Sequence, residues 1–290
     1  MPPQDRPAPK QTDLERFAVP RNVAIATTAA RAAKALSEVD RFAAPGDEPL
    51  ATATTLTLDQ PFRFDRGLAK RLRLREINAS EAFTLRDATH TYFRASLTAY
   101  DDAGGAAIPY EQMPASPEPS IDIILACAIL ARQRMHVVMQ KATELGARRI
   151  VPLLTDHSVP PAGLRAEQPH AWAGHIARAA RQCRRSSLPH LLPITSLDTF
   201  LTSPLLAATD LKLYLDDRTD PLPAPANPPG RLVLFIGPEG GFSDAERARL
   251  ATTAQGWRLG GRILRAETAA LVALTMAHAT WGDFRSTQFI

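Results

Sequence analysis

The sequence is short of the residues from which disulfide scaffolds and metal centres are built. It has two cysteines, Cys127 and Cys183, in 290 residues, which excludes a disulfide-rich secreted scaffold and supplies no cysteine set for a metal. Its histidines lack metal-ligand spacing, so we expect no metal. No segment approaches the roughly 20 apolar residues that a membrane span needs, and the polar, proline-rich N-terminus carries no sign of a signal peptide. These absences predict a cytoplasmic protein without a metal or a membrane partner.

Lysine is also scarce, whereas arginine is abundant. Of the 34 basic residues, 5 are lysine and 29 are arginine, and the formal net charge is +4. Arginine presents a rigid fork to phosphate groups and a flat face to bases, so the composition favours RNA as a partner. A GC-rich coding sequence would favour arginine as well. The clustering of the arginines is therefore more informative than their number.

One stretch, residues 231–274, organises the rest of the chain. It begins with the apolar run 232–236, which predicts a short strand buried on both faces. The run ends in GPEGG, residues 237–241, a turn whose bare backbone lets a ligand come close. Ser243, with Glu246 three residues later, then forms a capping-box pattern. A helix is therefore expected to begin directly after the turn.

A second turn of the same kind lies further along the chain. A short strand that reaches Leu259 leads through residues 260–265 into a helix that begins near Glu267. Open α/β sheets bind ligands at such strand-to-helix turns. The first turn is not a P-loop, because no Lys-Ser/Thr pair follows its glycines, and it is not a GxGxxG fingerprint. Each turn alone has a purely structural interpretation, but two of them in one region favour a ligand site.

The composition changes along the chain predict two domains. Residues 1–13 read as a disordered tail. In residues 14–105, strand-like runs separated by polar turns, with a helix expected over 65–75, predict a small β-barrel or sandwich. Residues 106–120 follow a Gly104-Gly105 pair, are rich in proline and read as a linker. From 121 to 290, strand and helix patterns alternate, which predicts an α/β fold with a mostly parallel sheet covered on both faces. The expected strands there are 121–130, 149–154, 190–194, 211–217 and 232–236, and the expected helices include 134–147 and 170–185.

Two clusters of arginine are candidates for RNA contacts. The first lies on the helix expected over 170–185, where spacings of three and four place most members on one face. We expect this face to bind phosphate groups, with a merely solvated face as the alternative. The second cluster lies on the helix over 65–75, where the two interpretations are evenly matched. The RNA-binding candidates are Arg178, Arg181 and Arg184 on the first helix and Arg66, Arg71 and Arg73 on the second.

The two glycine turns also resemble the motifs of a known family. The phrases GPEGGFSDAE (237–246) and LGGRILRAETAALVAL (259–274) are similar to the 16S ribosomal RNA uridine-N3 methyltransferases, a branch of the SPOUT superfamily. Looser similarity covers most of the chain, including KATELGARRIVPL (141–153) and RQCRRSSLP (181–189). In the second of these phrases Arg184 stands where the family usually has a glycine.

The resemblance implies a fold, a cofactor and a partner. It implies a SPOUT-like knotted parallel-sheet domain over residues 121–290, preceded by a divergent PUA-like RNA-binding β-barrel. It also implies S-adenosylmethionine as cofactor and N3 of a uridine in 16S rRNA of the small ribosomal subunit as the methyl acceptor. A homodimer is expected, since SPOUT enzymes usually pair. The apolar segment 269–281 would pack on such a partner or, equally well, in its own core.

From the resemblance and the turn geometry we assign candidate site residues. Arg265 is the first candidate for stabilising negative charge on the uracil oxygens, and Arg185 is the second. Glu267 is expected to orient Arg265, to act as a base, or simply to stabilise the start of its helix. The cofactor-binding candidates are Leu153, Leu154, Gly237, Pro238, Glu239, Gly240, Leu259, Gly260, Ile263, Leu264 and Thr268.

Two other functions remain open from the sequence. The altered basic motifs are compatible with a non-catalytic RNA-binding or ribosome-assembly factor on the same scaffold, although the intact stretch 231–274 argues against it. A transfer to a ribose 2′-oxygen, instead of a base nitrogen, is also compatible with these residues.

Overall fold

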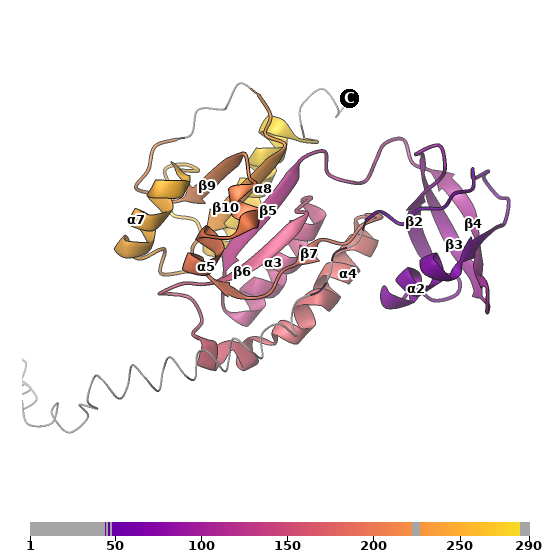
Figure 1. Cartoon of the computed structure of the whole chain (residues 1–290), viewed down its shortest axis with the longest axis horizontal. Helices are drawn as coiled ribbons and strands as arrows, with labels where there is room; N and C mark the ends of the chain where they lie inside the picture. The colour runs from indigo at the N-terminus through magenta and orange to yellow at the C-terminus, as the bar shows by residue number, and fades with distance from the viewer. Residues whose placement is uncertain (1–43, 45, 47, 222–226, 285–290) are drawn as a thin grey trace, which may run out of the picture.

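The computed structural model of the protein describes residues 44, 46, 48–221 and 227–284. Within these residues the chain forms a smaller part that contains residues 62–112 and a larger part that contains residues 122–281, and the two lie side by side (Figure 1). The tail predicted over residues 1–13 lies outside the described residues.

The smaller part is an antiparallel sheet with one helix against it. Its elements are β1 (Phe62–Asp65), α2 (Arg66–Leu74), β2 (Ala82–Arg86), β3 (Tyr92–Tyr100) and β4 (Gly104–Gln112), in the strand order β1-β4-β3-β2. Helix α2 starts where the Asp65 carboxylate accepts a hydrogen bond from the amide of Leu68 at 2.8 Å, and it buries Leu68 and Leu72 in the core of this part. The helix expected over 65–75 is thus confirmed. Residues 106–112, which the sequence assigned to a linker, lie within β4.

The larger part is built on a parallel sheet. Its strands are β5 (Asp122–Ala128), β6 (Arg149–Leu154), β7 (His190–Leu191), β8 (Thr195–Ser196), β9 (Leu211–Leu215), β10 (Arg231–Ile236) and β11 (Gln255–Trp257). The order is β11-β9-β10-β5-β6-β7, β8 also pairs with β6, and all of these pairings are parallel. The parallel sheet expected from the alternating pattern is confirmed.

Strand β10 lies inside this sheet, between β9 and β5. Leu232 and Leu234 face one apolar cluster, and Val233 and Phe235 face the other. All four are fully buried, and burial of a side chain of this size contributes roughly 1.5–3 kcal/mol. The prediction of a strand buried on both faces is therefore correct.

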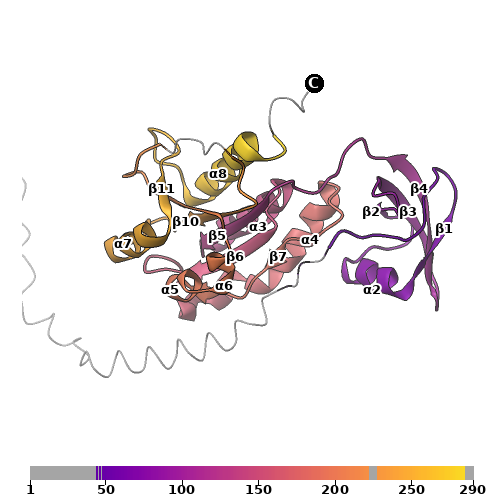
Figure 2. The same ribbon diagram turned by 45° about the horizontal axis from the view of Figure 1, so that its top comes forward.

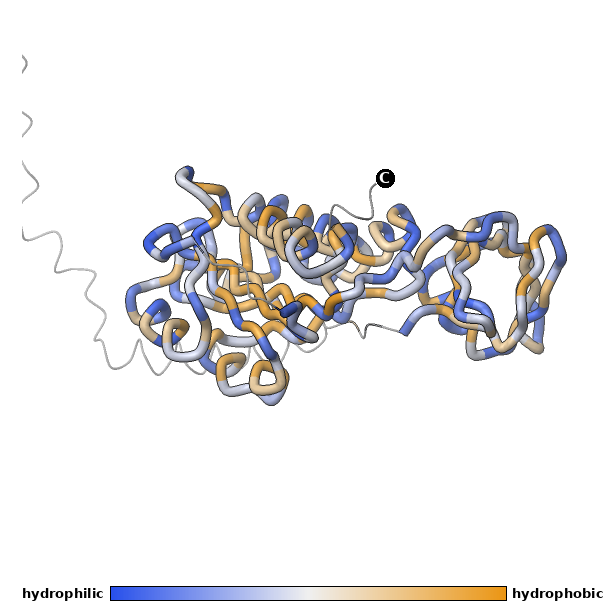
Figure 3. The backbone as a smooth tube through the Cα atoms, turned by 90° about the horizontal axis from the view of Figure 1, so that it is seen from above, coloured by the Kyte–Doolittle hydropathy of each residue, from blue (hydrophilic) through white to orange (hydrophobic). Residues whose placement is uncertain are grey.

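Helices cover both faces of the sheet (Figures 1 and 2). On one face α3 (Arg132–Glu144), α4 (Trp172–Gln182) and α8 (Ala266–Trp281) supply side chains to one core, as does the 3₁₀ helix η4 (Pro161–Glu167). A second 3₁₀ helix, η5 (Pro169–Ala171), leads into α4. On the other face lie α5 (Leu197–Leu201), α6 (Pro204–Ala207) and α7 (Asp244–Thr253). Figure 3 shows the most hydrophobic segments along the strands between these layers. None of the helices in the described ranges is long and apolar enough to cross a membrane.

A buried ion pair ties the segment between the two parts to the end of α4. Glu118 accepts hydrogen bonds from the amides of Ser186 and Ser187 at 2.7 and 2.8 Å, and its carboxylate lies 3.5 Å from Nε of Arg185. Arg185 also donates to two backbone carbonyl oxygens near the end of α3, at 3.1 and 2.9 Å. Both charged side chains are almost fully buried, and burial lowers the pKa of the Arg185 guanidinium while Glu118 opposes that shift. Arg185 therefore has a structural role, because it connects Glu118 to the end of α3 inside the protein.

Glu118→Gln is expected to destabilise the fold, because it leaves the buried Arg185 guanidinium without its charge partner. Removal of one member of a buried pair costs about 3–5 kcal/mol. The control Arg249→Gln removes a partly exposed pair with Asp198 and is expected to cost about 1 kcal/mol or less. Urea unfolding followed by tryptophan fluorescence measures both changes. Equal losses of unfolding free energy in the two variants would contradict a stabilising role of the buried Glu118–Arg185 pair.

Candidate functional site

The first glycine turn connects β10 to α7 and is held closed by its own backbone. The amide of Gly241 donates to the carbonyl oxygen of Pro238 at 2.9 Å. Gly241 has φ of 69°, a left-handed conformation that glycine adopts without a steric penalty. The expected capping box is present, since Ser243 and Glu246 exchange hydrogen bonds at the start of α7. The turn therefore presents bare backbone at a fixed position beside the end of β10.

The second turn, residues 258–265, connects β11 to α8 and is more open. A Cβ atom added at Gly260 or Gly261 would meet no atom within 4 Å. Ile263 is 87% exposed, and the neighbouring Arg262 and Arg265 are exposed as well. Arg265 occupies the N-cap position of α8 but makes no side-chain cap hydrogen bond. The side chains of this turn are thus available to a ligand or to another molecule.

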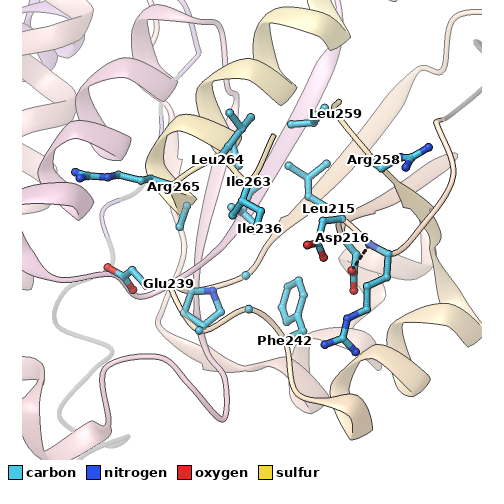
Figure 4. A pocket seen from close by; sticks show the side chains of 18 of the residues that line it. Leu215, Asp216, Ile236, Glu239, Phe242, Arg258, Leu259, Ile263, Leu264 and Arg265 are labelled. Atoms are coloured by element: carbon cyan, nitrogen blue, oxygen red, sulfur yellow. Dashed lines mark hydrogen bonds between the residues drawn. The ribbon is translucent and has the colours of Figure 1, made fainter. Parts of the chain in front are cut away.

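The two turns and the end of β9 enclose a pocket of about 540 Å³. Figure 4 shows Glu239 and Arg265 on one side of it and Asp216 and Arg258 on the other, with apolar side chains between them. The apolar part of the lining is Leu215, Ile236, Phe242, Trp257, Leu259, Ile263 and Leu264. A pocket with charged ends and an apolar middle suits a ligand that carries polar groups at both ends.

An arginine from α3 connects the two glycine turns. Arg134 lines the pocket, and its Nη1 lies 2.5 Å from Oε1 of Glu239 in the first turn. Its Nε lies 3.9 Å from Oε1 of Glu267, the second residue of α8. The other carboxylate oxygen of Glu267, Oε2, is buried and has no hydrogen-bond partner among the described residues. Glu267 itself is not part of the lining, but this oxygen remains able to accept a hydrogen bond.

Most of the predicted cofactor-binding residues meet at this pocket. Its lining includes Gly237, Pro238, Glu239, Gly240, Leu259, Gly260, Ile263 and Leu264, together with the catalytic candidate Arg265.

The other candidates lie outside the lining. Leu153 is buried in one apolar core and Leu154 packs against the other; β6, which carries both, is separated from β10 by β5. Thr268 lies on a different face of α8 from the lining residues Ala266 and Ala269. Arg185, the second catalytic candidate, belongs to the buried pair with Glu118 and does not reach the pocket.

Sequence reasoning missed the contribution of β9 to the pocket. Leu215, Asp216, Asp217 and Arg218 all line it. Asp216 directly follows a strand that pairs in parallel with β10, and neighbouring parallel strands end at the same edge of a sheet. That rule would have found these residues, had the strand order been known. Arg134 was missed as well, because nothing in its own segment marks it.

The arginines at the end of α4 contact the smaller part of the protein. Arg184 pairs with Glu111 at 2.7 Å, and Arg181 lies 3.7 Å from Glu81. Arg178 is exposed on the same helix. Arg184 has φ of 66°, which costs a residue with a side chain roughly 1–2 kcal/mol; glycine, the usual residue here in the resembling family, avoids this cost.

The arginines of α2 are engaged within the smaller part. Arg66 donates to the carbonyl oxygen of Asp102 at 2.5 Å, and Arg71 donates to those of Glu48 and Pro49. The guanidinium of Arg73 stacks over the ring of Tyr100 at 4.3 Å. These side chains lie at the surface to different degrees, and none of them is near the pocket.

The site contains neither a metal cluster nor a reactive thiol. In the described part of the chain, no group of three or more His, Cys, Asp or Glu side chains is placed to hold a metal ion. Cys127 is paired in the sheet with Ile236, a residue of the pocket lining, and its side chain is fully buried. Burial raises the pKa of its thiol to about 12, and the carboxylates of Glu239 and Glu267 act in the same direction. The available chemistry is that of carboxylates, guanidinium groups and backbone.

Comparison with known proteins gives consistent matches. A family model described as an RNA methyltransferase domain matches residues 116–278. A protein named ribosomal RNA small subunit methyltransferase E from Synechocystis is 30% identical over 221 residues, which cover 71% of this chain and 69% of that protein. A protein of the same name from Mesomycoplasma hyopneumoniae is 32% identical over 169 residues, which cover 57% and 73% of the two chains.

Two solved structures are similar over most of the chain. A putative methyltransferase from Legionella pneumophila, in complex with the cofactor SAM, superposes with a TM-score of 0.58 at 30% identity, covering 81% of this chain and 98% of that one. A ribosomal RNA small subunit methyltransferase E from Neisseria gonorrhoeae, bound to S-adenosyl methionine, superposes with a TM-score of 0.59 at 27% identity, covering 82% and 100%.

Cys127 is expected to resist alkylation in the folded protein. Because its pKa is raised to about 12, the reactive thiolate is almost absent at pH 8 and becomes abundant only as the pH approaches that value. Iodoacetamide treatment followed by peptide mass spectrometry measures the extent of modification. The same treatment in urea, where both cysteines are accessible, is the control. Rapid labelling of Cys127 at pH 8 without urea would show that the pocket wall opens.

Proposed function

The chain belongs to the family of ribosomal RNA small subunit methyltransferase E proteins, and we propose that its methyl acceptor is N3 of a uridine in 16S rRNA. It is an S-adenosylmethionine-dependent rRNA methyltransferase. The observation that carries this conclusion is the pocket enclosed by the two glycine turns, because the family motifs and the cavity coincide there. The choice of N3 rests on the resemblance of residues 237–246 and 259–274 to the uridine-N3 enzymes.

The residues of the pocket fit S-adenosylmethionine. Its volume of about 540 Å³ accommodates a nucleoside joined to an amino acid. Bare backbone at Gly237 and Gly240 allows close approach, and Leu259 and Leu264 supply apolar surface for a base. When bound, the cofactor supplies an electrophilic methyl group on a sulfonium. The protein has to orient the acceptor toward that group and exclude water.

Two residues beside the pocket supply the polar chemistry of the transfer. N3 of uridine carries a proton, and its loss places negative charge on the uracil oxygens. Arg265 lines the pocket, and a guanidinium stays protonated, so it stabilises that charge. We assign Glu267 as the proton acceptor, because it contacts the lining residue Arg134 and its Oε2 has no hydrogen-bond partner among the described residues. Arg134 holds the neighbouring Glu239 and thereby the first turn.

RNA binds along the surface that runs from the pocket to the smaller part. Arg178, Arg181 and Arg184 lie on α4 or directly after it, and the last two also bridge to the smaller part. We assign the smaller part to a divergent PUA-like module, and residues 121–290 to a SPOUT domain with a trefoil knot at the pocket loops. Four antiparallel strands with a basic helix, the SPOUT-like motifs at 237–246 and 259–274, and the similarity to two almost whole methyltransferase chains support these assignments. Methylation of rRNA would take place in the cytoplasm.

Arg265→Ala is expected to lower the single-turnover rate of methyl transfer by about 100-fold or more, because one electrostatic contact to a developing charge is worth about 2.7–4 kcal/mol. Affinity for S-adenosylmethionine, measured by calorimetry, should change little. The matched control is Arg249→Ala, which removes the same charge from α7 outside the pocket. Transfer of a labelled methyl group to rRNA at the parental rate in the Arg265 variant would refute its catalytic role.

Arg184→Ala is expected to weaken RNA binding and to flatten its salt dependence, because each phosphate that an arginine neutralises contributes roughly 0.7–0.9 units to the slope. Glu111→Gln frees Arg184 from its ion pair and removes a repulsive charge, so it should strengthen RNA binding. Filter binding to rRNA fragments over a range of salt concentrations measures both variants. If Arg184 only docks the smaller part, the two variants will weaken binding alike, and the RNA assignment is wrong.

A homodimer through the larger part is expected, because α8 keeps apolar side chains at its surface. Leu271 and Val272 are half-buried and Met276 is 37% exposed, so this face remains available to a second copy. Light scattering at micromolar concentration should give twice the mass of the 31.5 kDa chain. Met276→Asp, on the exposed face, should shift the equilibrium to monomer. A monomer mass for the unaltered protein at that concentration would exclude a stable dimer.

A further inference from the structure

Asp216, directly after β9, carries a polar group that the protein itself does not satisfy. Its side chain is 3% exposed and lines the pocket. Oδ1 accepts a hydrogen bond from the amide of Arg218 at 2.9 Å. Oδ2 is buried and accepts no hydrogen bond from the described residues; Nη1 of Arg247 lies 3.6 Å from it, beyond hydrogen-bond distance.

An acceptor of this kind points to a donor on a ligand. Buried polar atoms in native proteins almost always have a partner, and an unsatisfied one at a binding site requires a specific explanation. The adjacent Asp217 also lines the pocket but is exposed to water, so it needs no such partner. Among the described carboxylates that line the pocket, Asp216 alone combines burial with a carboxylate oxygen that accepts no hydrogen bond.

The position of Asp216 in the sheet indicates which part of a ligand it meets. The register pairs Tyr214 of β9 with Phe235 of β10, so Asp216 and Gly237 lie two residues further along the adjacent parallel strands. In open α/β sheets that bind dinucleotides, an acidic residue at the end of the strand beside the glycine turn accepts a hydrogen bond from a ribose hydroxyl. Asp216 takes the corresponding place at the end of the neighbouring strand, although it precedes the glycine turn in the chain and that turn has a different sequence.

The distribution of charge across the pocket agrees with this placement. Figure 4 shows Asp216 beside Leu215 and Arg258, across the pocket from Glu239 and the catalytic candidate Arg265. The sulfonium methyl lies between the methionine and adenosyl parts of the ligand and belongs near Arg265, so one of these two parts extends toward Asp216. The apolar Leu215 and Leu259 lie close enough to cover a flat base. A neutral hydroxyl donor suits Oδ2, because Arg247 already provides a positive charge nearby.

We propose that Asp216 determines recognition of the cofactor's ribose, with its Oδ2 accepting a hydrogen bond from a ribose hydroxyl group. This inference rests on the proposed use of S-adenosylmethionine. A hydrogen bond between a hydroxyl and a buried carboxylate is of the charged kind. Its loss should therefore reduce affinity by about ten- to a hundred-fold.

The test measures ligand affinity by calorimetry, without a methyl-transfer reaction. The ligands are S-adenosylhomocysteine and its 2′-deoxy and 3′-deoxy counterparts. The unaltered protein should bind at least one deoxy compound about ten- to a hundred-fold more weakly than the parent compound. In Asp216→Ala, which has no acceptor, that ratio should fall to about one. Asp216→Asn keeps one neutral acceptor and should give an intermediate ratio. The ratio is measured within each variant, so partial unfolding affects both ligands equally.

Asp244→Asn is the matched control. Asp244 is the other carboxylate that pairs with Arg247, at 3.0 Å, and it lies outside the pocket lining. Its substitution disturbs the same arginine and should leave the ratio unchanged. The proposal would be overturned if Asp216→Ala kept the affinity ratio of the unaltered protein. It would also be overturned if the ratio fell to about one in Asp244→Asn. Failure of the unaltered protein to bind any of these ligands, or S-adenosylmethionine itself, would instead refute the proposed cofactor.

Discussion

The structure depends on one packing constraint, namely the burial of β10 on both faces between two parallel neighbours. Because its side chains alternate between two apolar cores, the strand cannot move to an edge or reverse its direction without exposing them. Its carboxyl end must then emerge beside the end of β9 and close to the turn after β11. The segments after β9, β10 and β11 meet at the pocket, together with Arg134 of α3, because this single strand fixes where its neighbours end.

Arginine serves three different physical purposes in this molecule. Arg185 is buried with Glu118 and supports the fold. Arg181 and Arg184 are partly exposed and bridge the larger part to the smaller one. Arg265, at the pocket, has no ion pair among the described residues, so its charge is available to a substrate. The excess of arginine in the composition therefore reflects structural roles as well as the RNA contacts that we propose, and burial and pairing distinguish the two.

Much of the fold and a part of the pocket lining could be predicted from the sequence. Apolar runs and capping patterns gave β10, α7 and the two glycine turns, because these depend on local spacing alone. The roles of Arg185 and Asp216 could not be predicted in the same way. The first depends on Glu118, far away in the chain, and the second on the order of strands in the sheet. Long-range pairing of this kind has no signature in the residues around either position.

The most direct test of the central claim is the chemical identity of the product. The purified protein is incubated with S-adenosylmethionine and small ribosomal subunits that lack the modification, and the rRNA is digested to nucleosides for mass spectrometry. We expect N3-methyluridine to appear in stoichiometric amount, and the Arg265→Ala protein to yield far less in the same time. The appearance of a 2′-O-methyl nucleoside, or of no methylated nucleoside at all, would contradict the account.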